Sequence, residues 1–474
     1  MSTPTPRPVL SALTAGGLGL LATGLVALPA PAQAATVTVK TESQLRAAVA
    51  RANKAAGEDT IRLGRSITLR KGSLEITDAL VLDGNGKQIR ARGKDRILDV
   101  VTDVTLRVED LTLRGGRAPE GESGGAIRAT GATLEVVDSR LVGNRALGEG
   151  ASGGAIMNDG GSVSVVGTRI ERNRAERAGG GIEANAGVTT VTDSVLRGNR
   201  TGAAPGNGGA LHLTGAGAVV VEGSRVLRNR ASAEGGGLWN SADGQMSVTG
   251  TLVARNRATG AEADQGGGGL FNDGGTMTVS DVRLVGNRAT GAAGSGGGLL
   301  DVGGTVSVQD TTMSKNRSAR AGGGLETAAG TVDLAEVDMS DNSTGDMPGN
   351  GGALHLTGAA QVTWNGGTVT GNDAAAQGGG LWNSETGFLV VIGVDVSGNT
   401  APEGADVYND GGIDQYRMCE WGIMKRAVEA ESSGLRHRKI VALGASMSKF
   451  AIAVAKDSNI YEPEMLKNKL ISVT

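Results

Sequence analysis

The chain has 474 residues, of which 80 are Gly and only 10 are aromatic, so it cannot build an ordinary aromatic-rich core. Hydrophobic residues make up 39% of the sequence and the glycines follow no strict triplet, which excludes a disordered linker and a collagen helix. With 46 basic and 49 acidic residues, the net charge of -3 gives no general attraction for nucleic acid or acidic membranes. The composition therefore predicts a repetitive fold.

Residues 1–34 are typical of a secretory signal peptide. Arg7 precedes a long apolar run over residues 9–28, and Ala32-Gln33-Ala34 forms a small-x-small cleavage site. The alternative is a membrane anchor, but the run contains four Gly and ends in Pro29 and Pro31. We expect cleavage after Ala34, no membrane span in the mature chain, and a protein that is secreted or held at the cell surface.

Residues 35–123 are predicted to form an N-terminal cap and the first coils of the fold. Residues 36–39 alternate as a strand does, and residues 44–55 place Leu45, Ala48, Val49 and Ala52 on one helical face. Ser43 or Thr41 is the expected helix N-cap. Such a helix would cover the open end of a strand stack, whose edge would otherwise remain unpaired.

Residues 124–412 repeat a short motif, Gly-Gly-[Ala/Gly]-[Ile/Leu], at nearly regular intervals. In residue number the intervals run 29, 26, 29, 27 and 32 and then start again, so a five-coil block is duplicated at an offset of 143, as from Gly124 to Gly267. The segment 205–216 recurs without change as 348–359. The motif begins at Gly124, Gly153, Gly179, Gly208, Gly235, Gly267, Gly296, Gly322, Gly351 and Gly378.

Three further columns define each repeat unit. An apolar residue lies three positions before an Asn in ten of ten units, and period-2 apolar residues precede it, as in a short strand. The column six before the Asn holds only Asp, Glu or Gly, which favours a tight turn. We therefore predict an all-β chain forming a right-handed parallel β-helix, a solenoid whose coils rise about 4.8 Å each. The ten Asn are Asn144, Asn173, Asn199, Asn229, Asn256, Asn287, Asn316, Asn342, Asn372 and Asn399.

These motifs carry a family resemblance. Gly-Gly-Ala-Ile at residues 124–127 and 153–156, with its apolar-x-x-Asn partner, resembles the repeats of chlamydial polymorphic outer-membrane proteins and related bacterial β-helix adhesins. Residues 45–61 are similar to the start of other secreted bacterial β-helix proteins. The resemblance covers about residues 36–412 and implies a pectin lyase-like fold on a bacterial surface, used in adhesion. The chain departs from that pattern by carrying Leu, Ile, Val or Met where those repeats usually have Phe, and by lacking their C-terminal barrel.

The candidate binding site is the column that follows each Gly-Gly-x-[Ile/Leu] motif. Alternation along a strand predicts that these side chains point outward, and four of the six aromatic residues between residues 36 and 412 fall in this column. An acid, an imidazole and two rings in a row would suit stacking on sugar rings, so we expect a polysaccharide or cell-surface glycan as partner. The alternative is that the rings stack for stability or lie under the Gly-rich loops. The predicted ligand-binding residues are Glu183, His212, Trp239, Phe271, Glu326, His355, Trp382 and Tyr408.

An enzymatic alternative uses the same face. Glu183 beside His212 would make an acid/base pair for a polysaccharide lyase or glycoside hydrolase. The sequence lacks the clustered acids of β-helix lyases and the Gly-His-Gly motif of galacturonase-like hydrolases. His212 and His355 lie five coils apart, too far to share an ion. We therefore expect a non-catalytic adhesion or glycan-binding protein with no metal and no cofactor.

A second candidate surface is a column of arginines that directly follows the Asn. Guanidinium groups stacked about 5 Å apart repel one another unless anions intervene, which favours a track for a polyanion. The alternative is that Glu149, Glu171, Glu176 and Glu234 neutralise the column, and the net charge favours this structural interpretation, with no nucleic-acid partner. The column consists of Arg145, Arg174, Arg200, Arg230, Arg257, Arg288 and Arg317.

Residues 413–474 form a tail whose composition differs from the repeats. Residues 421–431 have helical periodicity, and residues 439–443 and 450–455 are apolar runs typical of buried strands, so we expect an α/β segment. Residues 439–446, 451–458 and 466–473 resemble an internal fragment of bacterial solute-binding proteins of the nitrate/taurine and thiamine-precursor type. A segment this short cannot form even one complete lobe of such a protein, so no solute binding is expected.

Overall fold

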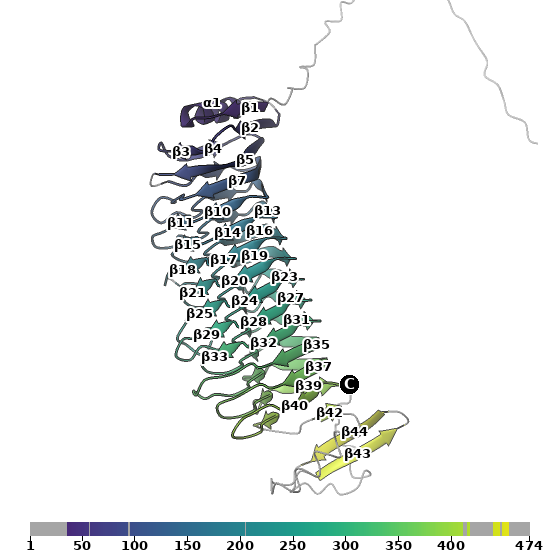
Figure 1. The fold of residues 1–474 in the computed structure, drawn as a ribbon. Coiled ribbons are helices and arrows are strands. Elements are labelled where there is room, and N and C mark those ends of the chain that lie inside the picture. Colours follow the sequence, from purple (N-terminus) through teal and green to yellow (C-terminus); the bar gives the residue numbers. More distant parts are fainter. Residues whose placement is uncertain are drawn as a thin grey trace, which may run out of the picture.

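The computed structural model describes residues 36–410 apart from 56, 93–94 and 204, together with the backbone of 415–417, 439–445 and 448–454. Within these residues the chain is a parallel β-solenoid of about 13 turns, so the predicted β-helix class is confirmed. Figure 1 shows the coils stacked as successive rungs of one rod. The predicted signal peptide lies outside the described residues.

Each coil contributes a strand to three long faces. The first face consists of β1 (Thr36–Val39), β2 (Asp59–Leu63), β5 (Leu80–Ala91), β7 (Thr105–Arg114), β9 (Thr133–Val137), β13 (Ser162–Val166), β16 (Ile182–Thr192), β19 (Leu211–Glu222), β23 (Gln245–Thr249), β27 (Thr276–Ser280), β31 (Thr305–Gln309), β35 (Thr331–Ser340), β37 (Gln361–Thr370), β39 (Phe388–Ile392) and β42 (Gln415–Arg417). Of these, β5, β7, β35 and β37 continue onto the second face.

In each coil, the strand of the second face follows the turn after the strand of the first face. The second face is completed by β3 (Ile67–Leu69), β10 (Arg140–Val142), β14 (Arg169–Glu171), β17 (Val195–Arg197), β20 (Arg225–Leu227), β24 (Leu252–Ala254), β28 (Arg283–Val285), β32 (Thr312–Ser314) and β40 (Asp395–Ser397). A short seven-stranded sheet lies next along the chain and holds the predicted arginine column: β11 (Arg145–Ala146), β15 (Arg174–Ala175), β18 (Arg200–Thr201), β21 (Arg230–Ala231), β25 (Arg257–Ala258), β29 (Arg288–Ala289) and β33 (Arg317–Ser318).

The third face closes each coil and carries the predicted binding column. It begins with β4 (Leu74–Ile76), β6 (Leu98–Val100), β8 (Ile127–Thr130) and β12 (Ile156–Asp159), and it takes the first residues of β16 and β19. It continues with β22 (Leu238–Asn240), β26 (Leu270–Asn272), β30 (Leu299–Asp301), β34 (Leu325–Thr327), β36 (Leu354–Leu356), β38 (Leu381–Asn383) and β41 (Val407–Asn409).

The N-terminal cap is the predicted amphipathic helix. Helix α1 (Glu42–Ala52) buries Leu45, Ala48, Val49 and Ala52, and the Thr41 side chain accepts a hydrogen bond from the Gln44 amide as N-cap. In Figure 1 this helix lies at one end of the rod, across the first coils. Two tail strands, β43 (Lys439–Ala445) and β44 (Ser448–Val454), pair antiparallel. The predicted tail helix over residues 421–431 lies outside the described residues.

The Gly-Gly pair of the repeat is needed because neighbouring coils touch there. Gly208 has a φ of +62°, and a Cβ on it would come within 2.5 Å of the Leu211 carbonyl oxygen. A Cβ on Gly209 would lie 2.2 Å from the Gly236 carbonyl oxygen in the next coil. The first Gly therefore makes the turn and the second allows the coils to stack at strand spacing. The predicted turn column also adopts positive φ, as at Asp138 (+44°) and Asp193 (+49°).

The Asn column forms a continuous buried ladder along the rod. Asn229 donates from its backbone amide and from Nδ2 to Oδ1 of Asn256, at 2.9 and 3.0 Å. Its Nδ2 also donates to the Leu196 carbonyl in the preceding coil, at 3.0 Å. The same bonds recur from Asn144 to Asn399, where Oδ1 of Asp406 accepts in place of a further Asn. The ladder thus satisfies the backbone at a corner that no strand covers.

We predict that Asn256→Ala destabilises the rod by about 2–3 kcal/mol, because it leaves the backbone and side-chain amides of Asn229 without their buried acceptor and removes a donor from the carbonyl of Val226. Chemical denaturation of the full-length chain measures this loss. Ser162→Ala, at an exposed strand position, is the control and should change the free energy of unfolding by less than about 0.5 kcal/mol. Equal effects of the two changes would contradict a structural role for the ladder.

Candidate functional site

The predicted binding column exists as an in-register row on the third face. Glu183 lies opposite His212, His212 opposite Trp239, and Trp239 opposite Phe271 in successive coils. The duplicated block repeats the order at Glu326, His355, Trp382 and Tyr408. The sequence therefore predicted correctly which side chains are brought together.

The side chains of this column point away from the main core, as predicted, but they are not exposed to solvent as a binding surface would be. Of the eight predicted binding residues, Tyr408 is half-buried. The other seven are only 1–9% exposed: Glu183, His212, Trp239, Phe271, Glu326, His355 and Trp382. Trp239, Phe271 and Leu300 form an apolar cluster separate from the main core. The side chains lie outside the main core, but loops contact them, as the alternative interpretation predicted. These loops, which lead into the third-face strands, are here called the covering loops: 176–181, 232–237, 319–324 and 374–380.

A buried polar cluster surrounds Glu183. Its Oε1 lies 3.0 Å from Nδ1 of His212, accepts from the Thr214 hydroxyl at 2.7 Å, and lies 3.4 Å from the Arg177 guanidinium. Its Oε2 is buried without a hydrogen-bond partner. All three contacts converge on one oxygen, so the carboxylate is held in place by a cation, an imidazole and a hydroxyl.

The same cluster recurs at the equivalent place in the second block. Arg320 binds Oε1 of Glu326 at 2.6 Å, the Thr357 hydroxyl donates to it at 2.9 Å, and Nδ1 of His355 lies 3.4 Å away. Burial alone would raise the pKa of the Glu326 carboxyl, but the neighbouring His355 and Arg320 outweigh it and lower that pKa to about 2. A carboxylate so firmly ionised is a poor general acid at neutral pH.

Sequence reasoning missed the threonines and arginines of these clusters. Thr214 and Thr357 lie in the segment that is identical in both blocks, and Arg177 and Arg320 occupy equivalent positions of the two blocks. Identity between duplicated blocks was thus the signal that could have found them. It marks residues whose contacts must be kept in both copies.

The aromatic rings of the column stack on one another. The ring centroids of His212 and Trp239 are 4.2 Å apart, and those of Trp239 and Phe271 are 5.9 Å apart with an interplanar angle of 7°. In the second block His355 and Trp382 are 4.2 Å apart, and Trp382 and Tyr408 are 6.4 Å apart. Both faces of Trp239 and of Trp382 meet another ring, so the stacked pairs leave no indole face free for a sugar.

The covering loops also supply hydrogen-bond acceptors for the indole N–H groups. Nε1 of Trp239 donates to Glu234 at 2.9 Å, and Nε1 of Trp382 donates to Gln377 at 3.2 Å. Burial, together with the charges of Asp273 and Asp264, raises the pKa of the Glu234 carboxyl to about 7, against the opposing hydrogen bonds from Trp239 and Asn207. Gln377 occupies the equivalent place in the second block without a charge.

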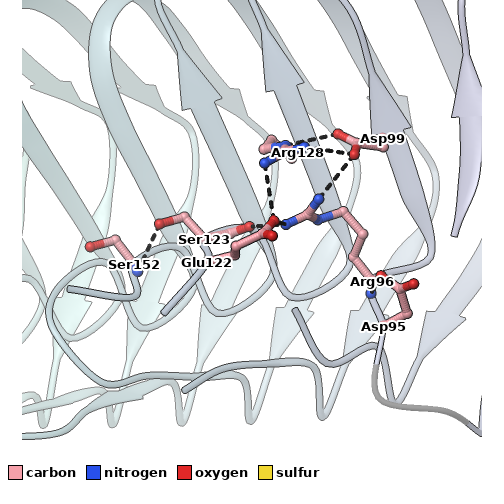
Figure 2. A network of polar contacts seen from close by, with 7 residues as sticks. All are labelled: Asp95, Arg96, Asp99, Glu122, Ser123, Arg128 and Ser152. Atoms are coloured by element: carbon pink, nitrogen blue, oxygen red, sulfur yellow. Dashed lines mark hydrogen bonds and ion pairs between the residues drawn. The ribbon is translucent and has the colours of Figure 1, made fainter. Parts of the chain in front are cut away.

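The first members of the column form an ion-pair network, shown in Figure 2. Arg128 lies opposite Asp99 and binds both of its carboxylate oxygens at 2.8 Å, and it also contacts Glu122 at 3.1 Å. Arg96, only 3% exposed, binds Asp99 at 2.9 Å and pairs with Glu122. Arg96, Arg128, Asp99 and Glu122 each have an opposite charge beside them, so the network neutralises itself and we interpret it as structural.

The second face presents a different surface, a shallow groove of about 410 Å³ lined by arginine. Its floor consists of the aliphatic side chains Leu227, Leu252, Ala254 and Val285, and its charged lining consists of Arg197, Arg225, Arg228, Arg255 and Arg283. No acidic residue lines the groove, and within residues 36–410 no ion pair joins an acid to any of the five arginines.

The predicted arginine column continues this basic surface on the short sheet. Six of its seven members are exposed and Arg174 is half-buried. Acids neutralise arginines in this region only at its N-terminal end, where Glu171 pairs with Arg140 and Arg169 and Glu176 pairs with Arg174. Glu234 bonds to Trp239 and Asn207 and makes no ion pair with the column. The expected neutralisation is therefore incomplete in the described residues.

Comparison with known protein families, with curated proteins and with solved structures finds no match for this chain. Among the described residues, no helix is long and apolar enough to cross a membrane. The same residues contain no cluster of three or more His, Cys, Asp or Glu side chains that would hold a metal ion.

We predict that Glu234→Gln raises the melting temperature by about 1–3 °C at pH 8 and has no effect below pH 4.5. The reason is that a carboxyl whose pKa is raised from 4.5 to about 7 on folding makes the fold less stable as pH rises between those values, and the amide remains neutral. Thermal melts from pH 4 to pH 8 measure the effect. The exposed Glu262→Gln is the control, and a pH-independent difference for Glu234→Gln would refute the assignment.

Proposed function

We propose that this protein is a secreted or cell-surface β-helix that binds acidic glycans without catalysis and acts in adhesion. The observation that carries the proposal is the groove of the second face, which is lined by five arginines and by no acidic residue. The signal-like residues 1–34 and the resemblance of the repeats to surface adhesins support the location and the role in adhesion.

The chemistry of the groove fits a sugar polymer that carries carboxylate or sulfate groups. A guanidinium is planar and binds such groups with two parallel hydrogen bonds. The aliphatic floor, formed by residues such as Leu227 and Leu252, offers apolar surface to the CH faces of a sugar ring. An acidic glycan satisfies the arginines and covers the floor at the same time.

The proposal moves the binding surface from the third face to the second. The aromatic column is buried and its rings stack on one another, so a glycan would have to displace the covering loops to reach Trp239 or Trp382. The second-face groove needs no such rearrangement.

An enzymatic role on the third face has less support. The contact between Glu183 and His212 at 3.0 Å is the observation that favours it. Both side chains are 1–2% exposed, and substrate hydroxyls cannot approach a carboxylate that is enclosed in this way. A binding function therefore accounts better for the exposed charge.

We predict that the full-length chain binds heparin and polygalacturonate and ignores neutral dextran. The triple variant Arg225→Gln, Arg228→Gln and Arg255→Gln should weaken binding at least about tenfold, because it removes three of the five cations of the groove. Biolayer interferometry on immobilised polysaccharide measures the affinity.

The matched control removes three exposed arginines from the N-terminal cap helix and the first coils, Arg51→Gln, Arg65→Gln and Arg90→Gln, with the same change in net charge. It should bind like the unmodified protein. Equal losses for both triple variants would show that only overall charge matters, and release of reducing or unsaturated sugars from the bound polysaccharide would contradict a non-catalytic function.

A further inference from the structure

The arginines of the groove belong to a larger basic surface that wraps around one corner of the rod. The turn between the second face and the short sheet carries Arg228 and Arg255, which adopt positive φ (+53° and +56°). Three of the four coils from residue 195 to 288 place arginines on both sides of that turn, for example Arg225 before it and Arg230 after it, and the fourth has Arg255 in the turn and Arg257 after it. The groove and the arginine column are thus two parallel tracks on either side of one corner.

Four consecutive coils show the density of this charge. The segments 195–200, 225–230, 252–257 and 283–288 contain no acidic residue. Their nine arginines are Arg197, Arg200, Arg225, Arg228, Arg230, Arg255, Arg257, Arg283 and Arg288. The strand register places Arg200 opposite Arg230, Arg230 opposite Arg257, and Arg257 opposite Arg288. Like charges are therefore held about 4.8 Å apart along the axis by the backbone itself.

The basic tracks have defined ends. At the N-terminal end Glu171 and Glu176 neutralise the neighbouring arginines. At the C-terminal end the short-sheet column passes from Arg317 to Ser343 and then to Asp373 in the following coils. The longest continuous run of the column without an acidic partner extends from Arg200 to Arg317, four coil steps or about 19 Å.

Resting on the proposed function, we infer that the ligand is a linear acidic polysaccharide that lies along the solenoid axis and contacts both arginine tracks. A small anion would neutralise one or two guanidinium groups and leave the rest repelling one another. A linear polyanion parallel to the axis meets a new arginine at every coil and displaces the counterions of all of them.

The second track offers polar contacts of its own. A depression on the short sheet is lined by Arg200, Arg230, Thr201 and Ser232, and at its N-terminal end by the ion pair of Arg174 and Glu176. Hydroxyl donors beside guanidinium groups suit the carboxylate or sulfate oxygens and the ring hydroxyls of a sugar. The same track contains no aromatic side chain, whereas single-stranded nucleic acid is usually bound by stacking its bases on aromatic rings. These features favour a glycan over a nucleic acid.

The test uses size-defined oligosaccharides prepared from heparin and the full-length chain. Isothermal titration should show affinity that rises with length until the oligosaccharide spans about 19 Å and then levels off. The variant Arg230→Gln, Arg257→Gln and Arg288→Gln, which leaves the groove lining intact, should weaken long oligosaccharides at least about tenfold and leave the shortest unchanged. The slope of log affinity against log salt should fall by roughly one for each arginine that contacts the chain.

The outcomes separate this inference from the proposed function. If the unmodified protein binds no acidic glycan, the proposed function fails. If the groove variant loses binding while affinity is independent of length and the short-sheet variant binds normally, the proposed function stands and the two-track inference is wrong. Tighter binding of oligodeoxythymidylate of equal length and charge would overturn the assignment to a glycan. The N-terminal variant Arg51→Gln, Arg65→Gln and Arg90→Gln controls for net charge.

Discussion

The structure depends on parallel pairing between each coil and the next at a register of one repeat. This pairing satisfies the backbone of one coil with that of its neighbours, as between β23 and β27, and it stacks every side chain on its counterpart. A residue type that recurs in the sequence thereby becomes a physical row with a spacing of about 4.8 Å. The side chains of one row touch one another, so they must pack, hydrogen-bond or carry charges without repulsion. This restricts the residue types that the sequence can place in a row.

Most rows of this protein meet that requirement directly. Aliphatic rows pack in the core, and the Asn row donates and accepts along its own length. The charged part of the third-face column meets it in a different way, by placing unlike groups in succession, as where Glu183 is followed by His212 and then by Trp239. The arginine row of the short sheet is the exception, since it repeats one charge without an intervening acid from Arg200 to Arg317. Self-repulsion that the fold does not relieve is the reason to look for an external anion there.

The fold was largely predictable from sequence because rows in a solenoid are visible as columns. The period, the Asn column and the turn column at Asp138 were all found in this way, whereas the buried face of helix α1 was found from its helical periodicity. The partners within the third-face column were also predicted, because they follow from the register alone. These features require only that each repeat unit forms one coil of the solenoid.

The exposure of the third face could not be predicted by the same reasoning. Alternation along a strand shows that Trp239 points away from the core, but it does not reveal the path of a Gly-rich loop that returns over it. The loop residues that matter, Glu234 and Arg177, follow no column shared by all units. The expected neutralisation of the arginine column by nearby acids was incomplete for a related reason. Glu234 is near the arginines in sequence, but its carboxylate accepts a hydrogen bond from the indole nitrogen of Trp239.

The most direct test of the central claim, that the arginine face is the binding surface, is arginine-selective modification with phenylglyoxal read by mass spectrometry, with and without heparin. Ligand should protect Arg225, Arg255 and Arg283 around the groove and Arg230 and Arg257 on the short sheet, while Arg51 in helix α1 and Arg90 in the first coils react as before. Unchanged labelling of the two tracks in the presence of bound heparin would contradict the account, as would protection confined to Arg177 and Arg320 in the covering loops of the third face.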